Sequence, residues 1–209
     1  MRPRATLFLL PTTSLAFVCC LLLCGCRGSS TSEVPASMRR IAMELPQTDG
    51  PLVLHVRSDA FEEGREIPDE YSADGRNMSP SVAWSGVPSV AKSIVVIVED
   101  PDAPPPQTPF IHWLVYEIAP TVERLQQDIP KVKQPEQPAG IVQGVNSAGS
   151  VGWFGPKPPK GDPPHHYHFQ VFALDRTPKL EPGATRQQVL QAMSGHVVAK
   201  GQVVAMYHR

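Results

Sequence analysis

The sequence predicts a mostly β domain with few helices, and three observations carry this prediction. Proline supplies 24 of the 209 residues, roughly double its usual share of about 5%, and proline favours strands and ordered loops over helices. After residue 50, short apolar runs alternate with Pro, Gly and Asp, which is typical of strands joined by turns. One late segment has the pattern of a helix. Many short strands with a single helix favour a mainly antiparallel sheet.

Residues 1–26 have the pattern of a lipoprotein-type signal segment and are excluded from the predicted fold. Basic residues precede an apolar stretch from Leu7 to Leu23, which Pro11 interrupts. All 4 cysteines of the chain lie in this segment, so the predicted domain cannot contain an internal disulfide. The run Leu23-Cys24-Gly25-Cys26 resembles a bacterial lipoprotein signal, in which cleavage before Cys26 exposes that cysteine to acylation.

Acylation at Cys26 would anchor an exported protein to a membrane of the bacterial cell envelope. Arg27 after this cysteine, in place of Asp, is compatible with sorting to the periplasmic side of the outer membrane. Two alternatives remain, namely ordinary secretory cleavage near Gly25 and a retained transmembrane anchor, which needs about 20 apolar residues. Residues 27–49 lack a sustained hydrophobic period and are predicted to be a flexible tether, which leaves residues 50–209 as the single folded domain.

Seven apolar runs qualify as strands because they are short, rich in β-branched or aromatic residues and bounded by turn residues. They are Leu52–Val56, Val82–Trp84, Ser93–Glu99, Ile111–Ile118, Gly140–Val145, Tyr167–Leu174 and Val203–Tyr207. The predicted helix begins after Thr185, which has the spacing of a capping box with Gln188, and it ends before Gly195. Its apolar face consists of Val189, Leu190 and Met193.

Charge and histidine spacing exclude two kinds of site. The formal net charge is −1 and the basic residues are scattered, so no nucleic-acid partner is expected. His166 and His168 form an i, i+2 pair on one face of a strand, but no third ligand accompanies them. We therefore predict no metal site and no cofactor.

Acidic residues follow the most apolar strand and form the first part of a candidate site. The run ends in Glu99-Asp100-Pro101-Asp102-Ala103-Pro104. Because the two prolines restrict the backbone, this loop should hold Asp100 and Asp102 in defined positions. Rigid carboxylates favour a binding site, although Asp before Pro also commonly caps a turn.

A histidine, a glycine loop and a late strand supply the other candidates. His112 lies among apolar neighbours and is either a satisfied core histidine or a site residue. Strand alternation places His165 and Tyr167 on the face that carries core residues. Gly155 lies in the Gly- and Pro-rich loop before them, where it would let a ligand approach backbone N–H groups.

In their order along residues 50–209, these pieces resemble the phosphatidylethanolamine-binding protein family, in its bacterial Raf-kinase-inhibitor-like branch. The similar segments are Asn77-Met78-Ser79-Pro80, Asp100-Pro101-Asp102-Ala103-Pro104, His112-Trp113, Gly155-Pro156 and His165-His166-Tyr167. The resemblance implies a β-sandwich with a shallow pocket for phosphate, acetate-like anions or phosphorylated head groups. The family's pocket positions correspond to Asp100, Asp102, His112, His165 and Tyr167. His166 departs from the family, which usually has Arg there, and alternation turns it away from the pocket.

We therefore expect non-enzymatic binding of a phosphoryl-bearing small molecule or phospholipid head group. Asp100 would orient a histidine, while the histidines, Tyr167 and the N–H groups near Gly155 contact the anion. Affinity should then rise as the pH falls through the histidine range, near 6.5. A second hypothesis is inhibition or regulation of an envelope protease or another protein through the proline-rich loop Pro156–Pro164. A hydrolase is disfavoured, because the sequence contains no G-x-S-x-G motif and no complete metal-ligand spacing.

Overall fold

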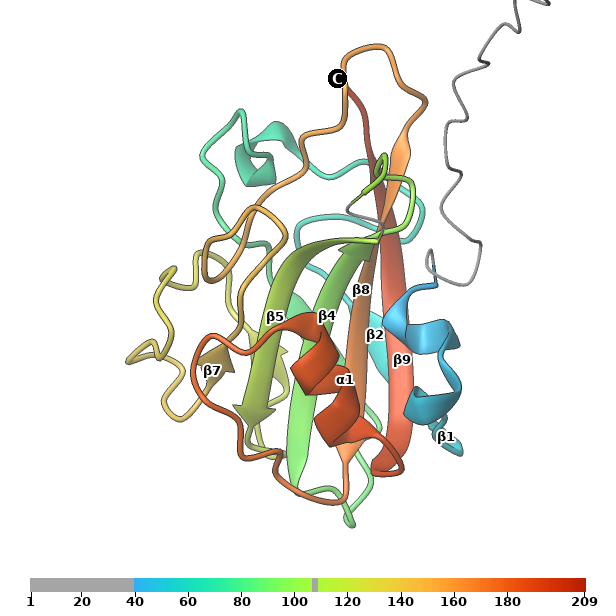
Figure 1. The fold of residues 1–209 in the computed structure, drawn as a ribbon, viewed down its shortest axis with the longest axis vertical. Helices are drawn as coiled ribbons and strands as arrows, with labels where there is room; N and C mark the ends of the chain where they lie inside the picture. Colours follow the sequence, from blue (N-terminus) through green and yellow to red (C-terminus); the bar gives the residue numbers. More distant parts are fainter. Residues whose placement is uncertain (1–39, 107–108) are drawn as a thin grey trace, which may run out of the picture. The chain divides into compact units, whose positions relative to one another are not determined.

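The computed structural model describes residues 40–106 and 109–209, and its strands form two sheets (Figure 1). The six-stranded sheet has the order β1 (Leu52–Val53), β9 (Val197–Tyr207), β8 (His165–Leu174), β4 (Ser93–Asp100), β5 (Phe110–Ile118) and β7 (Val142–Gln143). The three-stranded sheet has the order β2 (His55–Arg57), β3 (Val82–Ser85) and β6 (Arg124–Leu125). Strand β1 runs parallel to β9, and the other paired strands of the described chain are antiparallel. The predicted mostly β fold is confirmed.

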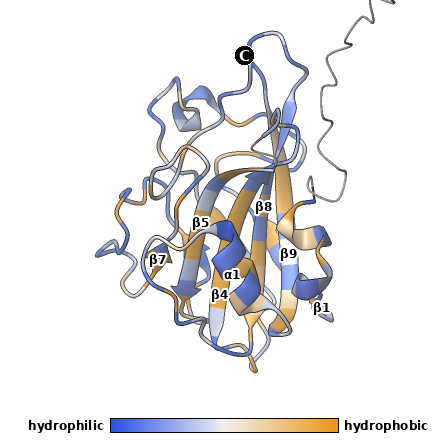
Figure 2. Cartoon of the chain, viewed as in Figure 1, coloured by the Kyte–Doolittle hydropathy of each residue, from blue (hydrophilic) through white to orange (hydrophobic). Residues whose placement is uncertain are grey.

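Strand β4 is buried on both faces, which explains its continuous apolar sequence. Ile94, Val96 and Val98 contribute to the core between the two sheets. Val95 and Ile97 point to the opposite face and contribute to a second core beneath the helix α1 (Arg186–Met193). Figure 2 shows hydrophobic residues along the central strands.

The helix α1 forms where the sequence predicts it. Thr185 accepts a hydrogen bond from the Gln188 backbone N–H, and the Gln188 side chain returns to the Thr185 backbone, so the capping box is present. Gly195 follows with a φ of 75°, a left-handed conformation that favours glycine at the end of a helix. The buried residues of the helix are Val189, Leu190 and Met193, as the apolar pattern predicts.

Three predicted strands differ from the observed ones. The run Leu52–Val56 divides at Leu54 into β1 and β2, which belong to different sheets. Leu54 instead donates its N–H to the carbonyl of Lys200, and its own carbonyl passes so near Gly201 that a Cβ there would lie 2.1 Å away. The last strand therefore extends through this glycine and begins at Val197, whereas the strand predicted over Gly140–Val145 contracts to β7.

The folded part also begins earlier than the predicted boundary at residue 50. Ile41, Ala42 and Thr48 are buried, and short 3₁₀ helices cover Ala42–Glu44 and Pro46–Thr48. The backbone N–H of Ala42 donates to Glu99 Oε2 at 2.6 Å, which attaches this segment to β4. Residues 40–49 are therefore part of the domain and not of a tether, while residues 27–39 lie outside the described residues.

Candidate functional site

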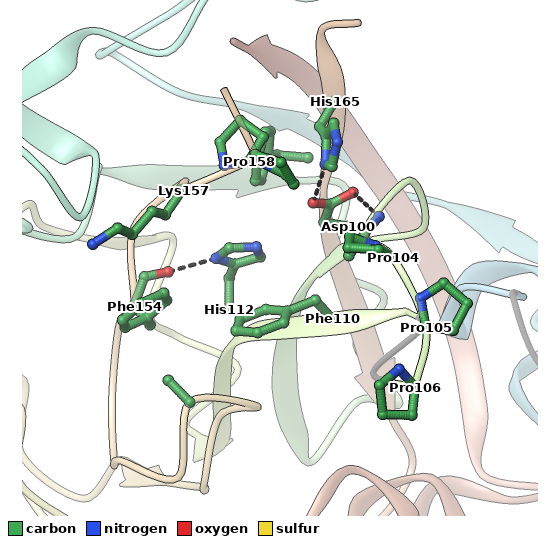
Figure 3. A pocket seen from close by; sticks show the side chains of 14 residues that line it. Asp100, Pro104, Pro105, Pro106, Phe110, His112, Phe154, Lys157, Pro158 and His165 are labelled. Carbon is green, nitrogen blue, oxygen red and sulfur yellow. Dashed lines mark hydrogen bonds and ion pairs between the residues drawn. The ribbon is translucent and has the colours of Figure 1, made fainter. Parts of the chain in front are cut away.

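A cavity of about 400 Å³ lies at one edge of the larger sheet, where β4 ends and β5 and β8 begin. Antiparallel pairing brings these three strand ends together, with Asp100 opposite Phe110 and Glu99 opposite His168. The polar side chains that line the cavity are Asp100, His112, Lys157, His165 and Tyr167. Its apolar wall consists of Ala103, Pro104, Pro105, Pro106, Phe110, Ala148, Phe154, Pro158 and Pro159 (Figure 3).

Asp100 and His165 form a buried pair at the cavity (Figure 3). Asp100 Oδ2 lies 2.8 Å from His165 Nδ1. Asp100 Oδ1 accepts hydrogen bonds from the backbone N–H groups of Asp102 at 2.8 Å and Ala103 at 3.1 Å. Burial raises the pKa of Asp100 above its ordinary value, while the hydrogen bond and the charge of His165 oppose this rise. Both carboxylate oxygens thus have donors within the protein, and the aspartate fixes the orientation of the histidine ring.

His112 has one nitrogen occupied and one without a partner. Its Nδ1 lies 2.5 Å from the carbonyl oxygen of Phe154 (Figure 3). A carbonyl oxygen only accepts hydrogen bonds, so Nδ1 carries the proton and Nε2 of the neutral ring is an acceptor. Nε2 is buried and has no hydrogen-bond partner among the described residues. Burial lowers the pKa of His112 from 6.5 to about 4, so the ring is neutral near pH 7.

Tyr167 supplies a second buried polar atom at the same cavity. Its ring centroid lies 5.0 Å from that of His112 in an edge-on arrangement. The hydroxyl has no hydrogen-bond partner within the described part of the chain. Burial raises the pKa of this hydroxyl, and the charge of Asp100 raises it further. The phenol therefore stays protonated and can donate a hydrogen bond, and an unpartnered buried hydroxyl is uncommon in a folded protein.

Two of the six predicted ligand-binding residues lie elsewhere. Asp102 Oδ2 lies 2.8 Å from both the backbone nitrogen and Nδ1 of His166, so this carboxylate holds an exposed histidine and does not line the cavity. Gly155 donates its N–H to Asn77 Oδ1 at 2.8 Å, so that N–H is not available to an anion. A Cβ at Gly155 would lie 2.2 Å from the carbonyl oxygen of Tyr71, and this close backbone contact accounts for the glycine.

Lys157 also lines the cavity and is not among the predicted site residues. Its ammonium group lies 3.2 Å from Asp74 Oδ1 and brings a positive charge to the rim. The sequence does contain a signal for it, since Lys157 and Lys160 are basic residues of the proline-rich loop Pro156–Pro164. Among the described residues, no group of three His, Cys, Asp or Glu side chains is placed to hold a metal ion.

The chain is similar to proteins of one family. Residues 57–208 match the family described as phosphatidylethanolamine-binding protein. A protein of Methanothermobacter thermautotrophicus named UPF0098 protein is 40% identical over 156 residues, which cover 75% of this chain and 99% of the relative. The crystal structure of YbcL from E. coli, described as a member of the mammalian PEBP family, superposes with a TM-score of 0.70 at 34% identity. That alignment covers 75% of this chain and 98% of YbcL.

One relative bears on the N-terminal segment. A Mycobacterium tuberculosis protein, LppC, whose name designates it a candidate lipoprotein, is 32% identical over 200 residues, covering 95% of this chain and 94% of LppC. Across residues 40–106 and 109–209, no helix combines the length and the hydropathy needed to cross a bilayer. Cys26, the predicted lipidation site, lies outside the described residues.

Proposed function

Because the chain belongs to the phosphatidylethanolamine-binding protein family, we propose that its cavity binds a small anionic, phosphoryl-bearing ligand without transforming it. The ligand would be a free phosphomonoester or the head group of a phospholipid, which share the phosphoryl group. The unpartnered Tyr167 hydroxyl carries this proposal. A protonated phenol in a cavity lined mainly by apolar side chains is a strong donor to an anion, because little water competes for it.

The acidic residue in the cavity is compatible with an anionic ligand. Asp100 accepts hydrogen bonds from two backbone N–H groups and faces His165 Nδ1 at 2.8 Å, so both of its oxygens already have partners within the protein. Lys157 adds a positive charge to the lining of the cavity. Its side chain pairs with Asp74 and is half exposed. The pair of Asp100 and His165 therefore acts as a rigid wall, and Tyr167 and Lys157 make the attractive contacts.

Binding without catalysis is supported by the chemistry of the wall. No Ser, Thr or Cys occurs among the described residues that line the cavity, so the usual hydroxyl and thiol nucleophiles are missing there. We further propose that the protein is exported and attached to the cell envelope through an acylated Cys26. The similarity to LppC supports this proposal. Attachment to a membrane would place the cavity near phospholipid head groups.

The substitution Tyr167→Phe tests the proposal, because it should lower the affinity for phosphate without lowering stability. It should weaken the binding of inorganic phosphate and phosphoethanolamine about tenfold or more, since a hydrogen bond to a charged group contributes about 1.5–3 kcal/mol. It should not lower the free energy of unfolding, because the hydroxyl has no partner within the described residues. Isothermal titration calorimetry and urea unfolding measure the two quantities.

Tyr116→Phe is the matched control. The Tyr116 hydroxyl donates to the carbonyl of Glu181 at 2.7 Å and accepts from the backbone N–H of Ala184 at 3.2 Å, on the face of the sheet beneath α1. Its loss should cost about 1–3 kcal/mol of stability, because the buried N–H of Ala184 loses its acceptor, and it should leave phosphate affinity unchanged. Binding of the protein to vesicles that contain phosphatidylethanolamine, compared with its binding of free phosphoethanolamine, shows whether the phosphoryl group comes from a lipid head group or from a free phosphomonoester. Equal phosphate affinity of the wild type and Tyr167→Phe would refute the proposed contact.

A further inference from the structure

We infer that the cavity selects the form of its anion that carries a hydrogen atom, because His112 presents a hydrogen-bond acceptor to the ligand. This inference rests on the proposed function and specifies which protonation state of a phosphoryl group binds. A phosphomonoester monoanion has one P–OH group, whereas the dianion has none. The sulfate ester of the same alcohol is a monoanion without a hydrogen on its oxygens. Of these three species, the phosphomonoester monoanion alone carries the hydrogen atom that His112 would detect.

The geometry fixes which ring nitrogen is the acceptor. The contact of 2.5 Å between Nδ1 and the carbonyl of Phe154 requires a proton on Nδ1. The ring is neutral near pH 7, since its pKa is lowered to about 4, so Nε2 has a lone pair and no proton. The ring also contacts Phe110, at a centroid distance of 4.8 Å, and Trp153, at 6.0 Å. Turning the ring to offer its donor instead would break the hydrogen bond to Phe154.

The charged and titratable groups around His112 leave this lone pair unoccupied. From β8, Tyr167 meets the ring edge-on, and the positive charge of His165 would disfavour a second proton on His112. From β4, Asp100 is directed to His165. From the loop before β8, Asp162 lies 3.6 Å from His165 Nε2, and Lys157 pairs with Asp74. No hydrogen-bond donor for Nε2 occurs among the described residues, and a ligand bound in the cavity that His112 lines can supply one.

Tyr167 and His112 together form a complementary pair, with one donor and one acceptor at the same cavity. A phosphoryl monoanion matches both, since one oxygen accepts from the tyrosine hydroxyl and its P–OH donates to Nε2. A dianion would place an oxygen lone pair against the lone pair of Nε2. It can bind only if one proton is taken up from solvent and held between the phosphoryl oxygen and Nε2. Binding above the second phosphate pKa, about 6, is therefore coupled to the uptake of one proton.

Calorimetric titration of methyl phosphate and methyl sulfate into the wild-type protein tests this coupling. At pH 5.5, methyl phosphate should bind at least about tenfold more tightly than methyl sulfate, because a site built to accept a hydrogen bond discriminates against a ligand that lacks the donor. Above pH 7, the affinity for methyl phosphate should fall about tenfold for each pH unit. Titrations at pH 8 in buffers of different ionisation enthalpy should show an uptake of about one proton for each bound ligand.

The variant His112→Gln assigns the proton to this residue. A glutamine amide does not titrate and can offer a donor as well as an acceptor. Proton uptake at pH 8 and the preference for phosphate over sulfate should both disappear in this variant. His168→Gln is the matched control, since His168 lies on β8, on the opposite face from His165 and Tyr167, and contacts Gln202. If His112→Gln does not fold, ¹⁵N NMR of the wild-type ring should still show an unprotonated Nε2 that becomes a hydrogen-bond acceptor when methyl phosphate binds.

The results separate this inference from the proposed function. If methyl phosphate binds and Tyr167→Phe weakens it, but no proton is taken up and methyl sulfate binds equally well, the inference is wrong and the proposed function stands. Proton uptake that persists in His112→Gln would also overturn the inference, since His165 would then be its source. If neither ester binds to the wild type at any pH, the proposed function fails and this inference fails with it.

Discussion

At the scale of single residues, the buried neutral His112 should make the folded state sensitive to acid. Its pKa is lowered from 6.5 to about 4 by burial, so between these pH values the unfolded chain binds more protons than the folded one. The contribution of the neutral His112 to the free energy of unfolding is therefore complete above pH 6.5. It is lost as the pH falls toward 4, by roughly 3 kcal/mol in total.

Urea unfolding at pH 7, 5.5 and 4 measures this loss in the absence of ligand. His112→Gln should flatten the dependence within the window, because the group that must take up the proton on unfolding is gone. His168→Gln should keep the wild-type slope, since that side chain is partly exposed. A wild-type slope that persists in His112→Gln would mean that other groups cause the acid sensitivity.

Single residues also show where the sequence was insufficient. His165 and Tyr167 were assigned to the core-facing side of their strand from alternation, and both are buried at the cavity. Residue type and loop position place Asp102 and Gly155 in the predicted site, and for Asp102 the family resemblance does so as well. Their roles depend on His166 and Asn77, which are distant in sequence, so local pattern could not separate a ligand contact from an internal one.

At the scale of elements, a buried carboxylate attaches the first described segment to the sheet. Glu99 is fully buried and accepts hydrogen bonds from the backbone of Ala42 at 2.6 Å, from Gln170 at 2.8 Å and from Arg186 Nε at 2.5 Å. Arg186 lies on α1 and also donates to the carbonyl of Arg40. This network joins the first 3₁₀ helix, β4, β8 and α1 on the face of the sheet opposite the smaller sheet.

The substitution Arg186→Met should lower the free energy of unfolding by about 3 kcal/mol, because it leaves a buried carboxylate without its counter-charge. Adding Glu99→Gln should recover part of this loss, and a double-mutant cycle from urea unfolding measures the coupling. Arg76→Met is the matched control and should change stability by less than about 0.5 kcal/mol, since Arg76 forms an exposed pair with Glu70 at 3.9 Å. Additive losses for the two substitutions would contradict the predicted coupling.

These elements also show which parts of the fold are determined by the local sequence. The capping box of α1 and the apolar run of β4 were predicted from neighbouring residues, because a helix end and a buried strand have local requirements. The division between β1 and β2 depends on Leu54 meeting Lys200 and Gly201 at the other end of the chain. The sequence predicts a tether over residues 40–49 because their contacts, such as the one between Ala42 and Glu99, join residues that are distant in sequence.

At the scale of the whole molecule, the proposed function combines a cavity in the folded domain with an anchor at Cys26. The described residues that line the cavity belong to strand ends and loops between residues 100 and 167, far from Cys26 in the sequence, so phosphate binding should not depend on the anchor. The anchor needs only the signal segment, so membrane attachment should not depend on the cavity. The two properties are therefore expected to be separable by mutation.

The substitution Cys26→Ser in the full chain should move the protein from the membrane fraction to the soluble fraction of a bacterial host, because acylation requires the cysteine thiol. Intact mass spectrometry should show acyl chains on the wild-type protein and none on this variant. Cys24→Ser is the matched control, since the proposed cleavage before Cys26 would remove this cysteine, and the variant should keep both acylation and membrane attachment. Phosphate affinity should be equal in all three proteins. A wild-type protein found soluble and unacylated would instead indicate ordinary secretory cleavage near Gly25, whereas a membrane-bound Cys26→Ser protein would indicate a retained apolar anchor.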